Sequence, residues 1–202
     1  MKYYIIAGEA SGDLHGSNLI KSIFNVDPLA DIRAWGGDLM MTQGADIVYH
    51  YKETAVMGYA NVLKNLGKLR NLMVECQKDI LQFNPDVIIL IDYPGFNLRI
   101  AKFAKQHNLK VYYYIAPKIW AWKKFRIKSI KKYIDRLYSI LPFEIDFYKN
   151  HNYEIEYIGN PILDAIEQQL NKHELFDDFV QRHKLDHKPI IALLPGSRKQ
   201  EI

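Results

Sequence analysis

Two stretches of this sequence place a carboxylate directly after an apolar run and just before a turn. In "IIAGEASGD", residues 5–13, Glu9 follows a short apolar segment, and in "VIILIDYPGFN", residues 87–97, Asp92 follows a fully apolar one. A carboxylate held beside apolar strand ends should have a raised pKa and could take a proton from an alcohol. The two acids are therefore candidates for acid–base chemistry.

The glycine turn around Glu9 is not a dinucleotide fingerprint. That motif needs its second glycine two positions after the first, whereas Gly8 and Gly12 are four positions apart. Asp13 can cap the helix that it begins, which leaves Glu9 as a second carboxylate beside the same turn. Two negative charges would repel a phosphate, so the turn favours neutral, hydroxyl-rich groups that donate to Glu9. The alternative is that both acids cap a surface turn.

The turn around Asp92 lies where open α/β sheets bind ligands, at the carboxyl ends of the strands. The alternative is that Asp92 only caps this turn. Asn97 stands near the start of the following helix, where an amide either caps the helix or contacts a substrate. We treat Asn97 as a candidate substrate-binding residue.

A second type of turn occurs near the end of the sequence, in "LLPGSRKQE". Here Gly196, Ser197 and Arg198 follow an apolar run at the predicted start of a helix. Backbone N–H groups and a guanidinium can jointly hold a phosphate at such a place. Unlike the first turn, this one suits an anion.

Basic residues are concentrated in "WAWKKFRIKSIKKYIDR", residues 120–136, which holds seven Lys or Arg against one Asp. Two tryptophans open the segment. The pattern fits a nucleic-acid groove, an anionic-lipid surface or a solvated helix with a core face. The candidate membrane or lipid contacts are Trp120, Trp122, Lys123, Lys124, Lys128 and Lys131.

Composition narrows the class of protein. The 202 residues are 49% hydrophobic and 25% charged with a formal net charge of +4, so a nucleic-acid role would need a concentrated basic face. The single cysteine, Cys76, excludes an internal disulfide framework and fits a reducing, cytoplasmic compartment. No apolar run is long enough to span a bilayer, and no signal peptide is recognisable, so membrane contact should be peripheral. The histidines lack metal-ligand spacing, so neither a metal nor another cofactor is expected, and His15 is expected to be exposed on a helix.

The alternation of strand-like and helix-like segments predicts βαβ units and a mostly parallel, Rossmann-like sheet. Strands are expected near residues 3–7, 31–35, 46–50, 86–92, 110–116, 136–141, 154–159 and 189–195, and helices from residue 13, over 59–83, from 96, over the basic segment, from 142 and up to about 183. The polar stretch before residue 189 looks like a linker. We therefore predict one domain over residues 1–185 and, over 186–202, a linker with the first strand and turn of another domain.

Taken together, these stretches resemble the lipid-A-disaccharide synthase family. The similar segments are "AGEASGDLHG", "AVMGYANVL", "PDVIILIDYPGFN", "YYIAPKIWAWKKFRIKSIKKYID", "LPFEIDFY", "YIGNPILD" and "LLPGSR". The resemblance implies a glycosyltransferase-B fold, in which two Rossmann-like domains flank the active cleft, and an inverting enzyme without a metal. The chain would be the acceptor-side half with the start of the donor-side half, and it would not catalyse transfer by itself.

The resemblance also implies a reaction and roles for residues. UDP-2,3-diacylglucosamine would donate its sugar to the 6-hydroxyl of 2,3-diacylglucosamine 1-phosphate, with Asp92 as the base, Glu9 orienting hydroxyls and Arg198 contacting phosphate. The family often has a second Asp three residues after the first, where this chain has Gly95. Because the substrates lie in a leaflet, the basic segment would meet the inner face of the inner membrane. One rival hypothesis is a non-catalytic module that binds nucleic acid or anionic membranes, although we do not expect nucleic acid as a partner. The other is a nicotinamide-dependent oxidoreductase, which the glycine spacing and the acids of the first turn disfavour.

Overall fold

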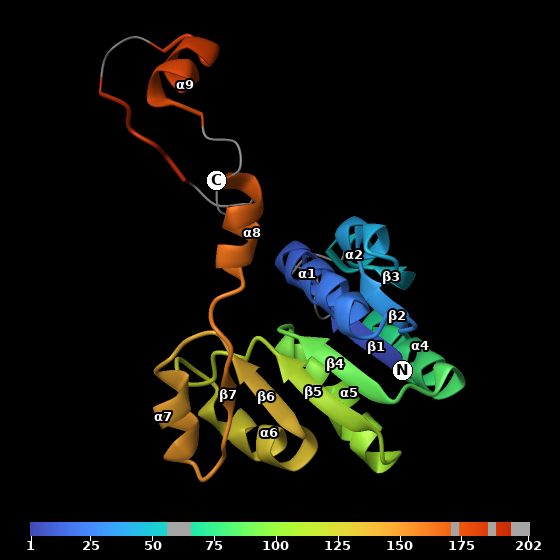
Figure 1. The fold of residues 1–202 in the computed structure, drawn as a ribbon. Helices are drawn as coiled ribbons and strands as arrows, with labels where there is room; N and C mark the ends of the chain where they lie inside the picture. Colours follow the sequence, from blue (N-terminus) through green and yellow to red (C-terminus); the bar gives the residue numbers. More distant parts are fainter. Residues whose placement is uncertain (56–65, 171–173, 186–188, 195–202) are drawn as a thin grey trace. The chain divides into compact units, whose positions relative to one another are not determined.

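One parallel sheet organises most of the residues that the computed structural model describes, which are 1–55, 66–170, 174–185 and 189–194 (Figure 1). The chain forms two compact units, Met1–Ala165 and Ile166–Ile202, and the sheet belongs to the first. The predicted domain boundary at residues 185 and 186 stays a prediction.

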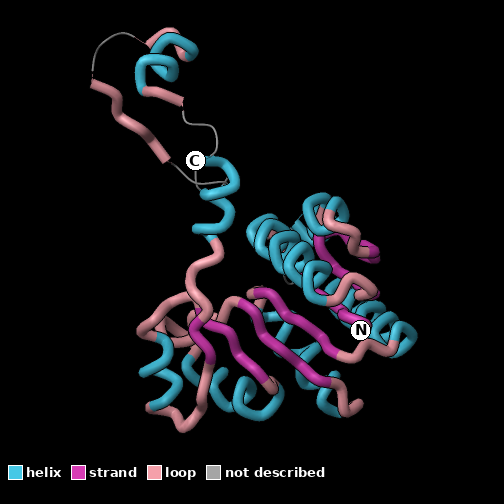
Figure 2. Tube along the Cα trace, viewed as in Figure 1, coloured by secondary structure: helices cyan, strands magenta, loops and turns pink. Residues whose placement is uncertain are grey.

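The sheet has seven strands in the order β3-β2-β1-β4-β5-β6-β7, and every neighbouring pair is parallel (Figures 1 and 2). This confirms the predicted Rossmann-like α/β fold. From β1 the chain first builds outward through β2 and β3, and it then returns to the other side of β1 with β4. The order therefore reverses between β1 and β4. The strands are β1 Lys2–Ala7, β2 Asp31–Gly36, β3 Asp46–His50, β4 Val87–Ile91, β5 Lys110–Tyr114, β6 Arg136–Ser139 and β7 Glu156–Tyr157.

Helices connect these strands and cover both faces of the sheet, as parallel sheets require. These helices are α1 Ala10–Val26, α2 Asp38–Thr42, α3 Tyr51–Ala55, α4 Leu66–Phe83, α5 Pro94–Gln106, the 3₁₀ helix η2 Lys124–Arg126, α6 Ile127–Tyr133 and α7 Glu144–Lys149. Two more helices, α8 Ile162–Leu170 and α9 Phe176–Arg182, follow the last strand. The short helices α2 and α3 were not predicted.

The core lies on the two faces of the sheet, and alternating residues of β1 point to opposite sides. Tyr4 and Ile6 belong to the cluster that contains the buried side chains of α4, α5 and α6. Ile5 and Ala7 belong to the cluster that contains Ile20 of α1 and Met40 of α2. Because both faces are covered, the central strands are nearly continuous apolar runs, and this made them recognisable in the sequence.

Two predicted elements differ from the structure. The basic segment is not one helix: η2 and α6 follow a loop, and Lys123 has a left-handed backbone conformation, with φ of 57°, just before η2. Residues 189–194, predicted as part of a strand, have no regular secondary structure, and Ile191 and Leu194 are 92% and 91% exposed. An apolar strand needs a neighbour to pair its backbone groups, and the described residues supply none at this segment.

Asp13 caps a helix other than the one predicted. Helix α1 begins at Ala10, so Asp13 lies inside its first turn, where it is only 2% exposed. Its carboxylate accepts hydrogen bonds from the backbone N–H groups of Gly37, Leu39 and Met40, at 2.8, 3.1 and 3.1 Å. These N–H groups open α2, so Asp13 supplies the negative charge that the α2 N-terminus favours and ties α1 to α2.

We expect Asp13→Asn to destabilise the fold by about 2 kcal/mol, because the amide loses the charge and cannot accept at both of its ends. Urea unfolding followed by circular dichroism measures the change. Asp31→Asn, at an exposed position, is the control and should stay within about 0.5 kcal/mol of the parent. Equal midpoints for the two variants would mean that the buried cap contributes nothing.

Candidate functional site

The two predicted acids follow neighbouring strands at the point where the strand order reverses. Strands β1 and β4 pair in register up to Ala7 and Ile91, and the chain then continues into Gly8 and Glu9 on one side and Asp92 on the other. Open α/β sheets bind their ligands in the crevice at this place. The structure therefore brings Glu9 and Asp92 to the carboxyl ends of two neighbouring strands, and their catalytic roles stay predictions.

The turn at Asp92 has an uncommon backbone. Asp92 and Tyr93 both have left-handed conformations, with φ of 42° and 47°, before Pro94 starts α5. This conformation costs about 1 kcal/mol or more for each residue that has a Cβ. The fold must therefore supply contacts that hold the turn.

Two buried donors supply such contacts. The Tyr113 hydroxyl, from the neighbouring strand β5, donates a hydrogen bond to the carbonyl oxygen of Asp92. The Asn97 side-chain amide donates to the same oxygen at 2.7 Å and to the carbonyl oxygen of Ile91 at 3.2 Å. Tyr113 and Asn97 are both 0% exposed. Substrate binding by Asn97 stays a prediction, and the structure places its amide beneath the turn.

The side chain of Tyr93 brings the turn after β4 into contact with the turn after β1. Its ring lies so close to Gly8 that a Cβ at that position would be 2.5 Å from Tyr93 Cδ1. The ring also stacks on Phe96 of α5, with 5.6 Å between the ring centroids. Glycine is needed at position 8 because the neighbouring turn already occupies the space of a side chain.

The surroundings of Asp92 disfavour the charged form of its carboxyl group. Desolvation is the largest cause that raises the pKa of Asp92, although the residue is exposed, and the charge of Glu9 raises this pKa further. Lys118 and the backbone N–H of Tyr93 act in the opposite direction. Sequence reasoning missed Lys118, although its position two residues after the predicted strand at 110–116 was the available signal.

Glu9 occupies the N-cap position of α1 but does not act as the cap. Its backbone is extended, its carbonyl oxygen accepts the Asp13 N–H at 3.0 Å, and its side chain makes no capping hydrogen bond with the described residues. Asp13 serves α2 instead. The simple alternative, in which both acids cap the first turn, therefore does not describe this structure.

Gly95 is the position at which the family pattern has a second acid. It lies in the first turn of α5, and a Cβ added there would meet no atom of the described residues within 4 Å. Packing therefore does not demand glycine at position 95. In this chain the acid that acts on Asp92 comes from the turn after β1 instead.

The two tryptophans of the basic segment have different environments. Trp120 is half-buried, its indole N–H donates to Glu144 at 2.9 Å, and its ring meets Phe143 edge-on with centroids 5.0 Å apart. Glu144 is 1% exposed and also accepts the Ser139 hydroxyl. Trp120 therefore anchors the loop after β5, and its predicted membrane contact stays untested.

Trp122, by contrast, is 63% exposed, and the Lys123 ammonium lies 3.8 Å from the centre of its ring. Phe125, three residues further on, is 70% exposed. Lys124 and Lys128 are exposed, and Lys131 donates to the carbonyl oxygen of His151 at 2.7 Å. The loop and η2 thus present aromatic rings and ammonium groups to solvent together.

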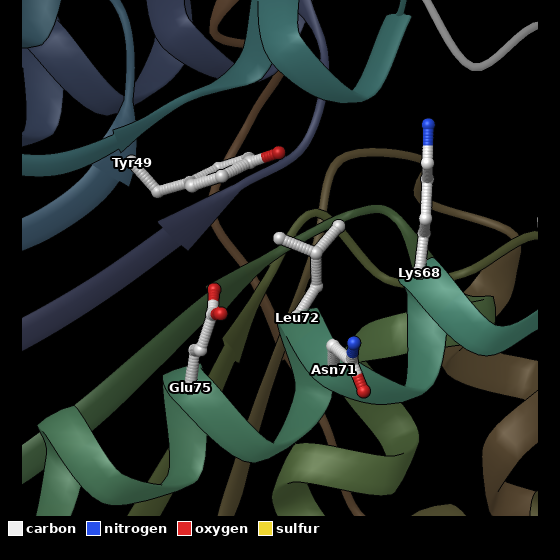
Figure 3. Close-up of a pocket in the computed structure, with 5 residues that line it drawn as sticks. All are labelled: Tyr49, Lys68, Asn71, Leu72 and Glu75. Carbon is white, nitrogen blue, oxygen red and sulfur yellow. The ribbon is translucent and has the colours of Figure 1, made fainter.

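A separate cavity of about 240 Å³ lies between β3 and the first half of α4 (Figure 3). The Tyr49 ring stands opposite Leu72, with polar side chains at the sides, and the lining residues are Tyr49, Lys68, Asn71, Leu72 and Glu75. No predicted site residue is among them. Tyr49 stacks on Trp35 at 4.5 Å between centroids, so the cavity borders the core.

Other predictions have mixed outcomes. Gly196, Ser197 and Arg198 lie outside the described residues. The expectation that His15 is exposed is wrong, because its exposed fraction is only 8%. Burial of the imidazole lowers the pKa of His15. Cys76 is buried, as expected of a small apolar side chain.

Neither a metal cluster nor a membrane-spanning helix is found among the described residues. In the described part of the chain, no three His, Cys, Asp or Glu side chains are grouped so as to hold a metal ion. None of the helices in the same ranges combines the length and apolar character needed to cross a bilayer.

Known structures share this fold. The UDP-GlcNAc 2-epimerase from Neisseria meningitidis, solved with UDP-GlcNAc bound, matches with a TM-score of 0.60 and 10% identity over 91% of this chain and 53% of its own. The Methanocaldococcus jannaschii UDP-GlcNAc 2-epimerase, in complex with UDP-GlcNAc and UDP, matches with a TM-score of 0.59 and 17% identity over 90% and 54%. At these identities the likeness shows the fold. Fold and site together define a Rossmann-like α/β protein with an acidic site at the switch point of its sheet.

Sequence comparison then gives the family. The family model described as lipid-A-disaccharide synthetase matches residues 3–202, and the chain belongs to this family. It is 39% identical to the lipid-A-disaccharide synthases of Trichlorobacter lovleyi and of Coxiella burnetii strain Dugway, over 98% of its own length. The chain spans about half the length of these relatives, 51% and 52%.

The raised pKa of Asp92 predicts how its removal changes stability with pH. A carboxyl whose folded pKa lies above its ordinary value of 3.8 stabilises the fold below that pH, and this contribution is lost as the pH rises through the folded pKa. Asp92→Asn should therefore be more stable than the parent at neutral pH, and the difference should vanish below pH 3.8. Urea midpoints across this pH range measure it.

Asp38→Asn is the control of opposite sign. Hydrogen bonds from Lys52 and His50 lower the pKa of Asp38, so its contribution is present above its ordinary pKa and disappears in acid. This variant should lose stability at neutral pH. A neutral-pH loss in Asp92→Asn as well would show that the edge does not disfavour the charged carboxylate.

Proposed function

We propose that the protein to which this chain belongs is an inverting glycosyltransferase that makes lipid A disaccharide 1-phosphate. It would join UDP-2,3-diacylglucosamine to 2,3-diacylglucosamine 1-phosphate and release UDP. The observation that carries the proposal is the position of Asp92, next to Glu9 at the switch point of the sheet, in a chain of the lipid-A-disaccharide synthetase family. The names of the curated relatives support the same reaction.

Asp92 is the proposed general base. Its carboxylate takes the proton from the 6-hydroxyl of the acceptor while that oxygen bonds to the anomeric carbon of the donor. The bond from this carbon to the UDP oxygen breaks, UDP leaves with the electron pair, and the configuration inverts. A carboxylate with a raised pKa suits this step, since a base works best when its pKa approaches the working pH.

Neighbouring groups have supporting roles in this proposal. Glu9 accepts hydrogen bonds from sugar hydroxyls in this proposal. This role agrees with its position beside the base, and its side chain does not cap α1. The positive charge of Lys118 limits the rise in the pKa of Asp92. Gly196, Ser197 and Arg198 would contact phosphate, as the family resemblance implies. The proposed reaction uses neither a metal nor another cofactor.

In the full-length enzyme, Asp92→Asn should lower kcat about a hundredfold to ten-thousandfold, because the amide cannot take the proton. Release of UDP from UDP-2,3-diacylglucosamine with acceptor present measures the rate. Glu9→Gln should cost less activity than Glu9→Ala, since the amide keeps an oxygen acceptor. Turnover of Asp92→Asn within about threefold of the parent would remove the base assignment, and equal losses at Glu9 would show that its charge matters.

We also infer that the protein works at the cytoplasmic face of the inner membrane as a peripheral protein. Both proposed substrates carry acyl chains and reside in a leaflet. Trp122 and Phe125 expose aromatic rings beside Lys123, Lys124 and Lys128, a combination that suits an interface with anionic lipid. The hydrogen bond of Trp120 to Glu144 supports a different role for that ring, which is to hold the loop in place.

Trp122→Ala should weaken binding to anionic vesicles and leave the melting temperature unchanged, whereas Trp120→Ala should lower the melting temperature because it leaves buried Glu144 short of a donor. Changing Lys123, Lys124 and Lys128 to Glu should also weaken vesicle binding, as flotation assays can measure.

The matched charge control changes Lys21, Lys78 and Lys102, which are exposed on other helices, to Glu. Equal losses in the two triple variants would mean that net charge, and not this segment, governs binding. Preference for single-stranded RNA over anionic vesicles at matched salt would instead favour the nucleic-acid hypothesis.

A further inference from the structure

The backbone turn that carries Asp92 has a conformation that its own residue types disfavour. Two consecutive non-glycine residues are left-handed, and Tyr93, which precedes α5, makes no capping hydrogen bond with its side chain to the described residues of that helix. Glycine would adopt this conformation without strain, and neither position has it. Groups outside the two residues must therefore help to hold this conformation.

Those groups converge on one atom, the carbonyl oxygen of Asp92. Tyr113 approaches it from β5, whose register pairs Leu90 with Tyr113. Asn97 approaches it from the first turns of α5, and its amide also reaches the carbonyl oxygen of Ile91. A carbonyl oxygen has two lone pairs, so two donors fill its capacity and fix the direction of the peptide.

Both donors are built into the core and are 0% exposed. Burial raises the pKa of Tyr113 well above its ordinary value, so its hydroxyl stays protonated and remains a donor at any working pH. Neither side chain reaches the solvent from which a substrate would arrive. The hydrogen bonds of these side chains are therefore directed at the protein's own backbone.

We propose that Tyr113 and Asn97 are positioning residues, which hold the left-handed turn so that the Asp92 carboxylate points into the site beside Glu9. The inference rests on the proposed function, because it assumes that Asp92 is the base. If either hydrogen bond is lost, the turn can relax toward an ordinary backbone conformation. The direction of the Asp92 Cα–Cβ bond then changes, and the carboxylate gains water and loses its fixed distance to Glu9.

The test is Tyr113→Phe in the full-length enzyme, with Tyr153→Phe as the matched control. Tyr153 also donates its hydroxyl to a backbone carbonyl, that of Ile134 at 3.0 Å, but away from the acid edge. Each variant removes one oxygen and keeps the ring. Both should lower the urea midpoint by a similar amount, so stability by itself does not separate the two.

Activity and its pH dependence do separate them. Tyr113→Phe should lower kcat at least tenfold with KM within about twofold, and it should move the acid limb of the kcat/KM profile to lower pH, because a better hydrated carboxylate has a lower pKa. Tyr153→Phe should leave kcat and the profile unchanged. A Tyr113→Phe enzyme that matches Tyr153→Phe in both quantities would overturn the inference.

Asn97→Asp gives a second test, because it preserves shape but turns a donor toward two carbonyl oxygens into an acceptor. It should lower kcat more than Tyr113→Phe does; if the variant does not fold, the tyrosine pair decides. Asp92→Asn, measured in parallel, separates the assignment of Asp92 as the base from the positioning roles of Tyr113 and Asn97. An active Asp92→Asn enzyme would overturn the base assignment and the inference together, whereas an inactive one beside a normal Tyr113→Phe would overturn the inference alone.

Discussion

The parallel pairing of β1 with β4 is the constraint on which the candidate site depends. Strands that are adjacent in the sheet but distant in the sequence end at the same level, Ala7 beside Ile91, so the next residues of each must share one small space. Gly8 is the result, since the ring of Tyr93 leaves no room for a Cβ. Glu9 and Asp92 follow these two strand ends, at the place where the strand order reverses.

The same pairing explains how the fold separates a structural carboxylate, Asp13, from the carboxylate that we propose as the base, Asp92. Asp13 lies in the first turn of α1, and its carboxylate accepts hydrogen bonds from three backbone N–H groups at the start of α2. Asp92 is left partly desolvated beside Glu9, with Lys118 as the opposing charge. A carboxylate whose hydrogen bonds are satisfied favours stability, and one held with fewer compensating contacts is suited to proton transfer.

Sequence reasoning located the strands and the acids that follow them because both signals are local. Buried parallel strands read as apolar runs, and a carboxylate directly after such a run is visible without knowing the fold. The partners of Asp13 and Trp120 and the burial of His15 were not visible in the sequence, since they depend on segments that only tertiary packing brings together. Asn97 illustrates both cases: its place at the start of a helix was predicted, whereas its amide serves the backbone of the preceding strand.

Gly95 shows how the edge can work without the second acid of the family pattern. A neighbouring acid in the same turn would raise the pKa of Asp92 by like-charge repulsion, and Gly95 offers none. Here the repulsion comes from Glu9, in the turn after β1, together with desolvation. Because the relevant charge belongs to another strand, the pKa of Asp92 depends on the geometry of the β1–β4 junction and on the hydrogen bonds that fix its own turn. The protonation of one carboxyl is thereby tied to the pairing of two strands and to the buried side chains of Tyr113 and Asn97.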